Sequence, residues 1–292
     1  MIKIITDSIC DLKADLIEKY GIEILPLRVR LGGEQEYLDR VEVDPPRIWD
    51  AMHRGIAPQT TQVPPSVTAS VFERCAAAGM DFIYVAFSAV LSGCCHVATL
   101  VSNELKEKYP KVKMGIINSK AGSFGQGSMV LQLAHAAAKG VSFEELMNRG
   151  AHMAEHVEIF IGLGDMKWLV LGGRVNKLLG KTGSMLDIRP IVHIDRQGYL
   201  KVVSAVRGQK RMIQSVCDKS LELLREFPEQ LIGLSYSEEY SSIEQAMEYM
   251  KDRLLNPRYY IQPIGCALTA HCGLEGVGVQ FFNTKIEPYY YD

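Results

Sequence analysis

Hydroxyl and amide side chains recur at four points where an apolar segment gives way to an amphipathic one. Such side chains can hold an anion without carrying a charge, because O–H and N–H groups donate hydrogen bonds to it. A helix N-terminus adds unpaired N–H groups and a partial positive charge. The four stretches are Thr6-Asp7-Ser8, Thr60-Thr61-Gln62, Ser88 to Gly93 and Asn118 to Ser123.

Three of these stretches also have a purely structural interpretation. Asp7 or Ser8 could cap a helix that begins near Leu12, and Ser66 could cap the helix that follows two prolines. Ser92 could likewise be only a cap. The residues alone leave both interpretations open, but several polar loops at one expected edge of a sheet favour a site more than any single loop does.

Basic and imidazole groups are available in the second half of the chain. Arg174 ends the turn Leu171-Gly172-Gly173-Arg174, and Arg207 follows a predicted strand. His271 lies in a glycine-rich stretch before the last predicted strand and could donate to a carboxylate, although a lone histidine is more often structural. These three residues are candidate contacts for an anion or a partner.

Enzyme signatures are incomplete. The chain has neither a GxSxG elbow nor a GxGxxG fingerprint, and Gly180-Lys181-Thr182 lacks the earlier glycine of a phosphate loop. His152-Met153-Ala154-Glu155-His156 matches the inverted zinc-protease pattern, but it lies at the predicted domain boundary, away from the polar loops. We predict no catalytic residue, no metal site and no cofactor.

Alternating strands and helices predict an α/β first domain over residues 1–157, built on a parallel sheet. Hairpins and helices predict an α+β second domain over 158–292, with a largely antiparallel sheet. Strands are predicted at Ile2–Thr6, Ile22–Arg28, Asp81–Ala86, Lys113–Ile117, Ile159–Leu163, Arg189–Ile194, Tyr199–Val203, Gln230–Ser235, Tyr259–Pro263 and Val277–Phe282. Helices are predicted at Leu12–Tyr20, Pro46–Arg54, Val67–Ala78, Ser92–Tyr109, Gln126–Lys139, Phe143–His156, Lys210–Arg225 and Ile243–Leu254.

The composition is that of an ordinary globular protein. The net charge of -2 argues against a nucleic-acid partner, which usually meets a basic excess. No window is apolar enough for a membrane span, and no secretory signal is visible at the N-terminus. The seven cysteines form no CxxC pair and are expected to be reduced thiols. We therefore expect a cytoplasmic protein.

Taken together, the motifs resemble the DegV family of bacterial lipid-binding proteins. They occur in the family's order and span nearly the whole chain. They are Ile5-Thr6-Asp7-Ser8, Thr60-Thr61-Gln62-Val63-Pro64-Pro65, Leu91-Ser92-Gly93-Cys94, Leu171-Gly172-Gly173-Arg174, Arg189-Pro190-Ile191, Gly198-Tyr199-Leu200, Arg207, Thr269-Ala270-His271-Cys272-Gly273 and Gly276-Val277-Gly278-Val279. The chain departs from the family pattern at Val63, Pro64, Cys94-Cys95-His96, Asn118, Cys272, Leu274 and Glu275.

The resemblance implies a two-domain fold that encloses a long-chain fatty acid in an internal tunnel. It implies carboxylate contacts from Thr61 and Ser92, with Thr60, Gly93 and His271 at the same site. It also implies that the chain is a carrier, which presents the acyl carboxylate to a separate ATP-dependent fatty acid kinase in phospholipid metabolism. The alternative is an enzyme, kinase-related or hydrolytic, that acts on a small anionic substrate in the same cleft.

Overall fold

The first half of the chain builds a parallel sheet whose strand ends gather the polar loops. The computed structural model describes residues 2–174 and 187–290. The sheet has the order β2-β1-β6-β7, and every pairing in it is parallel. Its strands are β1 (Lys3–Asp7), β2 (Glu23–Leu25), β6 (Phe82–Ala86) and β7 (Met114–Asn118). The polar residues after β1, β6 and β7 therefore emerge at one edge.

Helices cover both faces of this sheet, which explains why its strands read as continuous apolar runs. On one face Ile5 and Tyr84 pack under α3 (Pro65–Ala77) and α4 (Cys94–Lys108). On the other face Ile4, Ile83 and Val85 pack under α5 (Ser123–Ala138) and α6 (Phe143–His156). Within the described residues, no helix is both long and apolar enough to cross a membrane.

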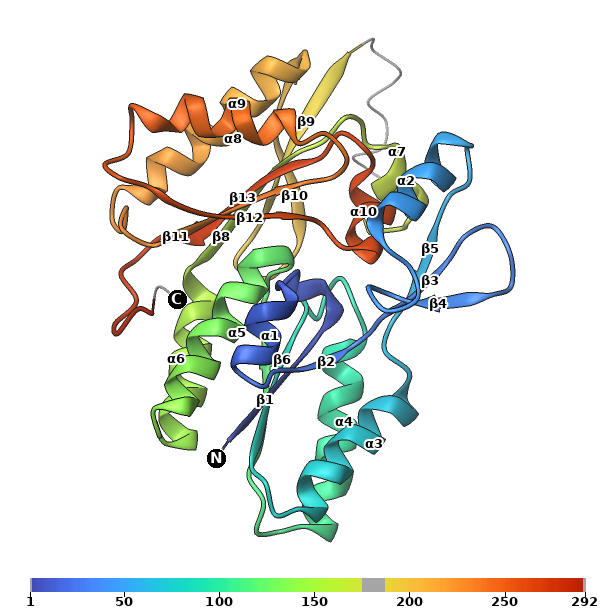
Figure 1. Ribbon diagram of the computed structural model, residues 1–292, viewed down its shortest axis with the longest axis vertical. Helices are drawn as coiled ribbons and strands as arrows, with labels where there is room; N and C mark the ends of the chain where they lie inside the picture. The colour runs from blue at the N-terminus through green and yellow to red at the C-terminus, as the bar shows by residue number, and fades with distance from the viewer. Residues whose placement is uncertain (1, 175–186, 291–292) are drawn as a thin grey trace.

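A second, larger sheet follows α6 directly. Its order is β10-β9-β8-β13-β11-β12, and all its pairings are antiparallel except β11 with β12. Helices α8 (Gln209–Leu224) and α9 (Ser241–Lys251) cover its outer face, while α5 lies between the two sheets (Figure 1). The predicted α/β class is confirmed, as is the largely antiparallel second sheet. Its strands are β8 (Val157–Gly162), β9 (Ile188–Ile194), β10 (Leu200–Arg207), β11 (Leu231–Tyr236), β12 (Arg258–Pro263) and β13 (Val277–Phe282).

The hairpin predicted between β9 and β10 is confirmed. Gly198 has a φ of 90° and closes the turn by donating to the Asp195 carbonyl at 2.8 Å. Only glycine takes this conformation without strain.

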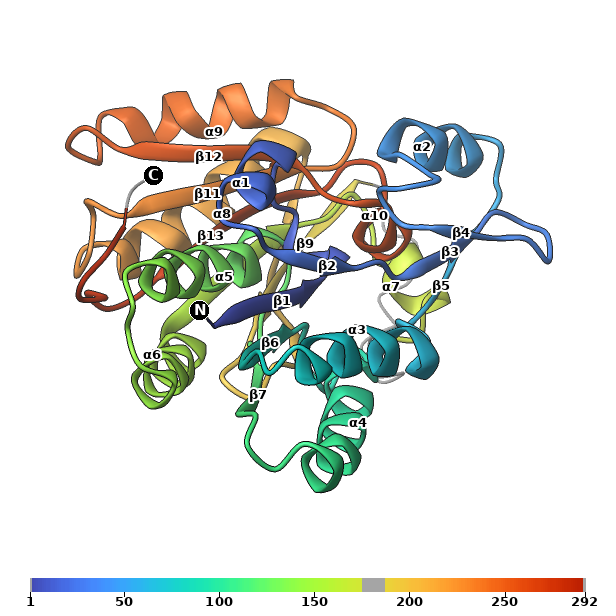
Figure 2. The ribbon, with the colours of Figure 1, turned by 60° about the horizontal axis from the view of Figure 1, so that its bottom comes forward.

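The single strand predicted over Ile22–Arg28 is wrong. The chain forms β2 and then β3 (Arg28–Arg30), which belong to different sheets, because Pro26 between them has no N–H to donate. Strand β3 pairs with β4 (Glu36–Leu38) and β5 (Gln59–Thr61) in a small antiparallel sheet. This sheet and α2 (Pro45–His53) lie beside α10 (Cys266–Cys272) (Figure 2).

Four short elements complete the described chain. They are η1 (Ser8–Cys10), α1 (Ala14–Lys19), α7 (Lys167–Leu171) and α10. Neither α7 nor α10 was predicted, because helices of five and seven residues are too short to show a period. The two contact each other, and both border the site described below.

Helix α5 is buried along almost its whole length and contacts both sheets. Two glycines on it allow this close approach. A Cβ at Gly125 would lie 2.6 Å from the Cδ1 atom of Ile159 on β8. A Cβ at Gly127 would lie 2.4 Å from the backbone oxygen of Cys10. Because the second obstacle is backbone, it cannot rotate away.

We predict that Gly127→Ala destabilises the protein by about 1–3 kcal/mol, because the added methyl group separates α5 from η1. The measurement is the free energy of unfolding from urea denaturation. Gly33→Ala is the matched control, since a Cβ at the exposed Gly33 meets nothing within 4 Å. Equal stability of the two variants would contradict the tight contact.

Candidate functional site

The Asp7 carboxylate fixes the loops at the strand ends. Its Oδ1 accepts from the Ile9 N–H at 3.3 Å and from Gln126 Nε2 at 3.0 Å. Its Oδ2 accepts from the Phe87 N–H at 2.9 Å and from the Tyr84 hydroxyl at 3.1 Å. Burial raises the pKa of Asp7 to about 6. Asp7 therefore caps η1, not a helix near Leu12, and it joins β1, β6 and α5.

Two further buried carboxylates hold the start of α10. Asp11 Oδ1 accepts from the Gly265 N–H at 2.9 Å, and Asp39 Oδ1 accepts from the Cys266 N–H at 3.1 Å. Burial raises the pKa of both carboxyls, to about 7 for Asp11. Because α10 also carries His271, these contacts attach that histidine to the first half of the chain.

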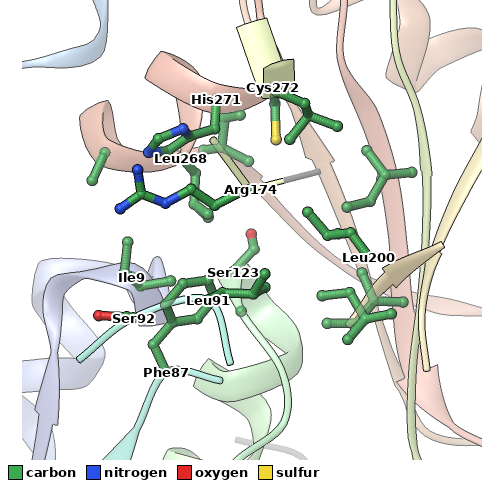
Figure 3. Close-up of a pocket in the computed structure, with 18 of the residues that line it drawn as sticks. Ile9, Phe87, Leu91, Ser92, Ser123, Arg174, Leu200, Leu268, His271 and Cys272 are labelled. Atoms are coloured by element: carbon green, nitrogen blue, oxygen red, sulfur yellow. The ribbon is translucent and has the colours of Figure 1, made fainter. Parts of the chain in front are cut away.

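A cavity of about 400 Å³ lies between the strand ends of the parallel sheet and the inner face of the larger sheet. Its volume is within the range of about 300–1,000 Å³ that is typical of small-molecule sites. Strands β8 and β9 with Leu200 supply an aliphatic wall. Ile9, Phe87 and Leu91 line the opposite side (Figure 3). The cavity is therefore suited to an apolar ligand body.

One end of the cavity is polar. Five residues predicted to bind a carboxylate line it: Thr60, Thr61, Ser92, Gly93 and His271. Arg174 lies beside the His271 ring, across the cavity from Ser92 (Figure 3). Among the residues that the structure describes, Arg174 is the only cation in the lining, and no aspartate or glutamate lines it. An anion at this end would meet donors and no like charge.

His271 joins the two halves of the polar end. Its Nε2 lies 2.8 Å from Thr60 Oγ1, and its Nδ1 has no hydrogen-bond partner among the described residues. A Cβ at Gly172 would lie 2.0 Å from Nδ1, so only glycine leaves room for the ring there. Burial, with a smaller contribution from Arg174, lowers the pKa of His271 to about 4. The imidazole is therefore neutral at pH 7.

Gln62 packs against Gly93, so the loop that carries Thr60 and Thr61 contacts the loop that carries Ser92. The sequence did not predict this contact. A Cβ at Gly93 would lie 1.8 Å from Gln62 Oε1, so the amide occupies the space that a side chain would take. Ser92 Oγ accepts from the Cys94 N–H at 3.3 Å, beside the N-terminus of α4. The N-cap of α4 is Gly93 and not Ser92, whereas Ser92 lines the cavity, so its role in binding a carboxylate stays a prediction. The cap predicted at Ser66 is wrong, because α3 already begins at Pro65.

Two predicted features lie away from the cavity. Arg207 is the exposed last residue of β10 and is not part of the lining. In the HxxEH stretch, Glu155 pairs with Lys120 and His156 Nδ1 bonds Asn283 Oδ1 at 2.9 Å. In residues 2–174 and 187–290, no three His, Cys, Asp or Glu side chains are placed to hold a metal ion. Gly180-Lys181-Thr182 falls outside those residues.

The fold and the cavity define an α/β protein with an apolar site between a parallel and a mixed sheet. The family model described as "Uncharacterised protein, DegV family" matches residues 1–284. The chain belongs to the DegV family. A DegV domain-containing protein of Caldanaerobacter subterraneus is 28% identical over 284 residues, covering 97% of this chain and 99% of that protein. One from Clostridium acetobutylicum is 31% identical over 225 residues, or 77% of each chain.

Solved structures share the fold. A fatty-acid-binding DegV family protein from Thermus thermophilus matches with a TM-score of 0.87 at 22% identity, covering 96% of this chain and 99% of that one. A stearic-acid-binding protein from Eubacterium ventriosum matches with a TM-score of 0.85 at 23% identity, covering 96% of this chain and 97% of that one. The fatty acid kinase B3 protein of Streptococcus pneumoniae, loaded with linoleic acid, matches with a TM-score of 0.83 at 21% identity. The match covers 97% of this chain and 99% of that one.

We predict that the His271 ring of ligand-free protein does not titrate above about pH 5.5, because burial disfavours its charged form. The measurement is the pH dependence of the histidine ring resonances by NMR, with His271→Gln used to assign the signal. The exposed His53 is the internal control. A midpoint for His271 near 6.5, the ordinary value, would show that the ring is solvated.

Proposed function

We propose that this protein binds a long-chain fatty acid in the cavity, with the carboxylate held at the polar end. The observation that carries the proposal is the lining itself, which is aliphatic along one wall and hydroxyl-rich at one end, where the described residues supply one cation and no acid. Membership of the DegV family, whose solved members include fatty-acid-binding proteins, supports it.

The apolar part of the ligand would supply most of the affinity. Burying a methylene group contributes roughly 0.8 kcal/mol, so about 14 methylenes give on the order of 11 kcal/mol before ordering costs. The carboxylate would accept from Thr61 and Ser92 near the N-terminus of α4, with Arg174 opposite. These contacts fix the orientation of the chain more than its affinity.

The proposal extends to the biological role. Residues 1–157 and residues 158–292 form two domains that close over the acyl chain. Binding of the fatty acid needs no cofactor. It presents the carboxylate to a separate ATP-dependent fatty acid kinase in the cytoplasm, so catalysis belongs to that partner. The likeness to the kinase B3 protein supports this role. Arg174 borders the cavity and is a candidate contact with the transferred phosphate or the partner, whereas Arg207 could act only from outside the cavity.

We predict that the purified protein carries, or takes up, one long-chain fatty acid per chain, because contact with an apolar ligand removes the apolar wall from water. The measurement is lipid extraction followed by mass spectrometry, before and after incubation with oleate and stearate. Protein that is empty and stays empty would refute the proposal.

We predict that Thr61→Val and Ser92→Ala each reduce acyl-phosphate formation by a kinase that accepts the wild-type complex, by about tenfold. Each variant removes a hydrogen bond to a charged group, whereas apolar burial keeps the chain bound. Ser66→Ala, which changes an exposed hydroxyl on α3, is the control.

Measuring both acyl-phosphate formation and lipid content distinguishes a misplaced carboxylate from a wrong function. Unchanged phosphorylation with full lipid content would place the carboxylate elsewhere. Turnover of a small anionic substrate without any partner, lost in His271→Ala, would instead support the enzyme alternative.

A further inference from the structure

The hydrogen bond between His271 and Thr60 joins the two halves of the chain at the polar end of the cavity, and both residues line that cavity. Thr60 is a half-buried residue of β5, whereas His271 lies in the last turn of α10. Nε2 of the ring lies 2.8 Å from Thr60 Oγ1, and either group can be the donor. The direction of this hydrogen bond decides whether the Thr60 hydroxyl can also donate to a ligand.

The surroundings of Nδ1 bear on which ring nitrogen carries the proton. Nδ1 is sealed from solvent and has no hydrogen-bond partner among the described residues. Gly172 packs so closely that a Cβ there would lie 2.0 Å from Nδ1, which leaves no room for a water molecule. Arg174, which lies beside the ring in Figure 3, donates through Nη1 to the Gly172 carbonyl. An Nδ1–H group would therefore meet no acceptor in the part of the chain that the structure describes.

A proton on Nε2 avoids this unpaired donor. Unpaired buried N–H groups are rarer in proteins than unpaired buried acceptors, and a bare Nδ1 is only an unpaired acceptor. Because burial lowers the pKa of His271 to about 4, the ring is neutral at pH 7 and carries its single proton on one nitrogen or the other. With that proton on Nε2, His271 donates and Thr60 Oγ1 accepts.

The same arrangement leaves the proton of the Thr60 hydroxyl unused. Within the described residues, the His271 ring is the one hydrogen-bond partner of Oγ1. A carboxylate can only accept hydrogen bonds, so it would pair with this proton. The opposite direction would use the proton on Nε2 and present only oxygen lone pairs to the anion. Thr61 and Ser92 line the same end of the cavity, and Thr60 would add a third hydroxyl donor there.

We propose that His271 is a positioning residue, which keeps its proton on Nε2 and donates it to Thr60, so that the Thr60 hydroxyl donates to the carboxylate of the bound fatty acid. His271 then acts on the ligand through Thr60 rather than through a contact of its own. This inference rests on the proposed fatty-acid function.

The first measurement is the tautomer of His271 in the wild-type protein loaded with oleate, at neutral pH. Proton–nitrogen NMR correlation spectra distinguish a protonated ring nitrogen from a bare one, and His271→Gln assigns the signals. We expect the proton on Nε2. A proton on Nδ1 would overturn the inference and leave the proposed function intact, whereas protein that takes up no oleate would overturn the proposed function itself. Because the tautomer is measured in the wild-type protein, this result does not depend on the folding of a variant.

The second measurement is a double-mutant cycle on the dissociation constant of oleate. Thr60→Val removes a hydrogen bond to a charged group and should weaken binding about tenfold. His271→Leu leaves the Thr60 hydroxyl free to rotate and should weaken binding about threefold, because the hydroxyl must then be ordered by the ligand. Since His271 acts through Thr60, the double variant should bind as weakly as Thr60→Val and no more weakly.

The matched control is His53→Leu, which changes an exposed histidine on α2 and should leave the dissociation constant unchanged. A double variant that is weaker than Thr60→Val by the full effect of His271→Leu would show that His271 acts on the carboxylate independently of Thr60, and this result would overturn the inference. Wild-type affinity in Thr60→Val would overturn it as well, because the Thr60 hydroxyl would then make no contact with the head group.

Discussion

The site depends on a buried carboxylate that the surrounding backbone is arranged to satisfy. Taking Asp7 out of water is costly, and four donors offset that cost together: the Tyr84 hydroxyl on β6, the Phe87 N–H just after β6, the Gln126 amide on α5 and the Ile9 N–H on η1. Since those donors belong to segments far apart in the sequence, the carboxylate can be satisfied only when the strand ends of β1 and β6 converge with α5. The same convergence brings Ile9, Phe87 and Ser92 to one cavity.

Asp11 and Asp39 extend this constraint to the second half of the chain. They accept from the first N–H groups of α10, and the opposite end of that helix carries His271 to Thr60. The polar end of the cavity is therefore assembled from both halves, with hydroxyls from the first, and an imidazole and a guanidinium from the second. The polar end exists only where residues of the two halves meet.

The sequence predicted the long elements and most of the polar end, for identifiable reasons. Buried parallel strands and 3.6-residue periodicity are local signals, and hydroxyls after a strand mark an edge where ligands bind. Elements whose stability comes from distant contacts were missed, as with β3, whose partners lie on β4 and β5. Gln62 was predicted only as part of a polar loop, because its contact with Gly93 joins residues that are distant in the sequence and close in space. Arg207 lies outside the lining, because a position in a motif does not determine which way a strand end faces, and its role as a partner contact stays a prediction.

The neutral state of His271 bears on what the polar end can do. A charged imidazole next to Arg174 would concentrate positive charge and favour a phosphate dianion or a small polyanion. With a neutral ring, Arg174 is the one cation that residues 2–174 and 187–290 supply to the lining, and one cation matches one carboxylate. An anion placed there would favour protonation of the ring, so binding of a carboxylate and uptake of a proton by His271 are thermodynamically coupled. A fatty acid bound as proposed would thus meet a polar end matched in charge to its single carboxylate and an aliphatic wall matched to its apolar body.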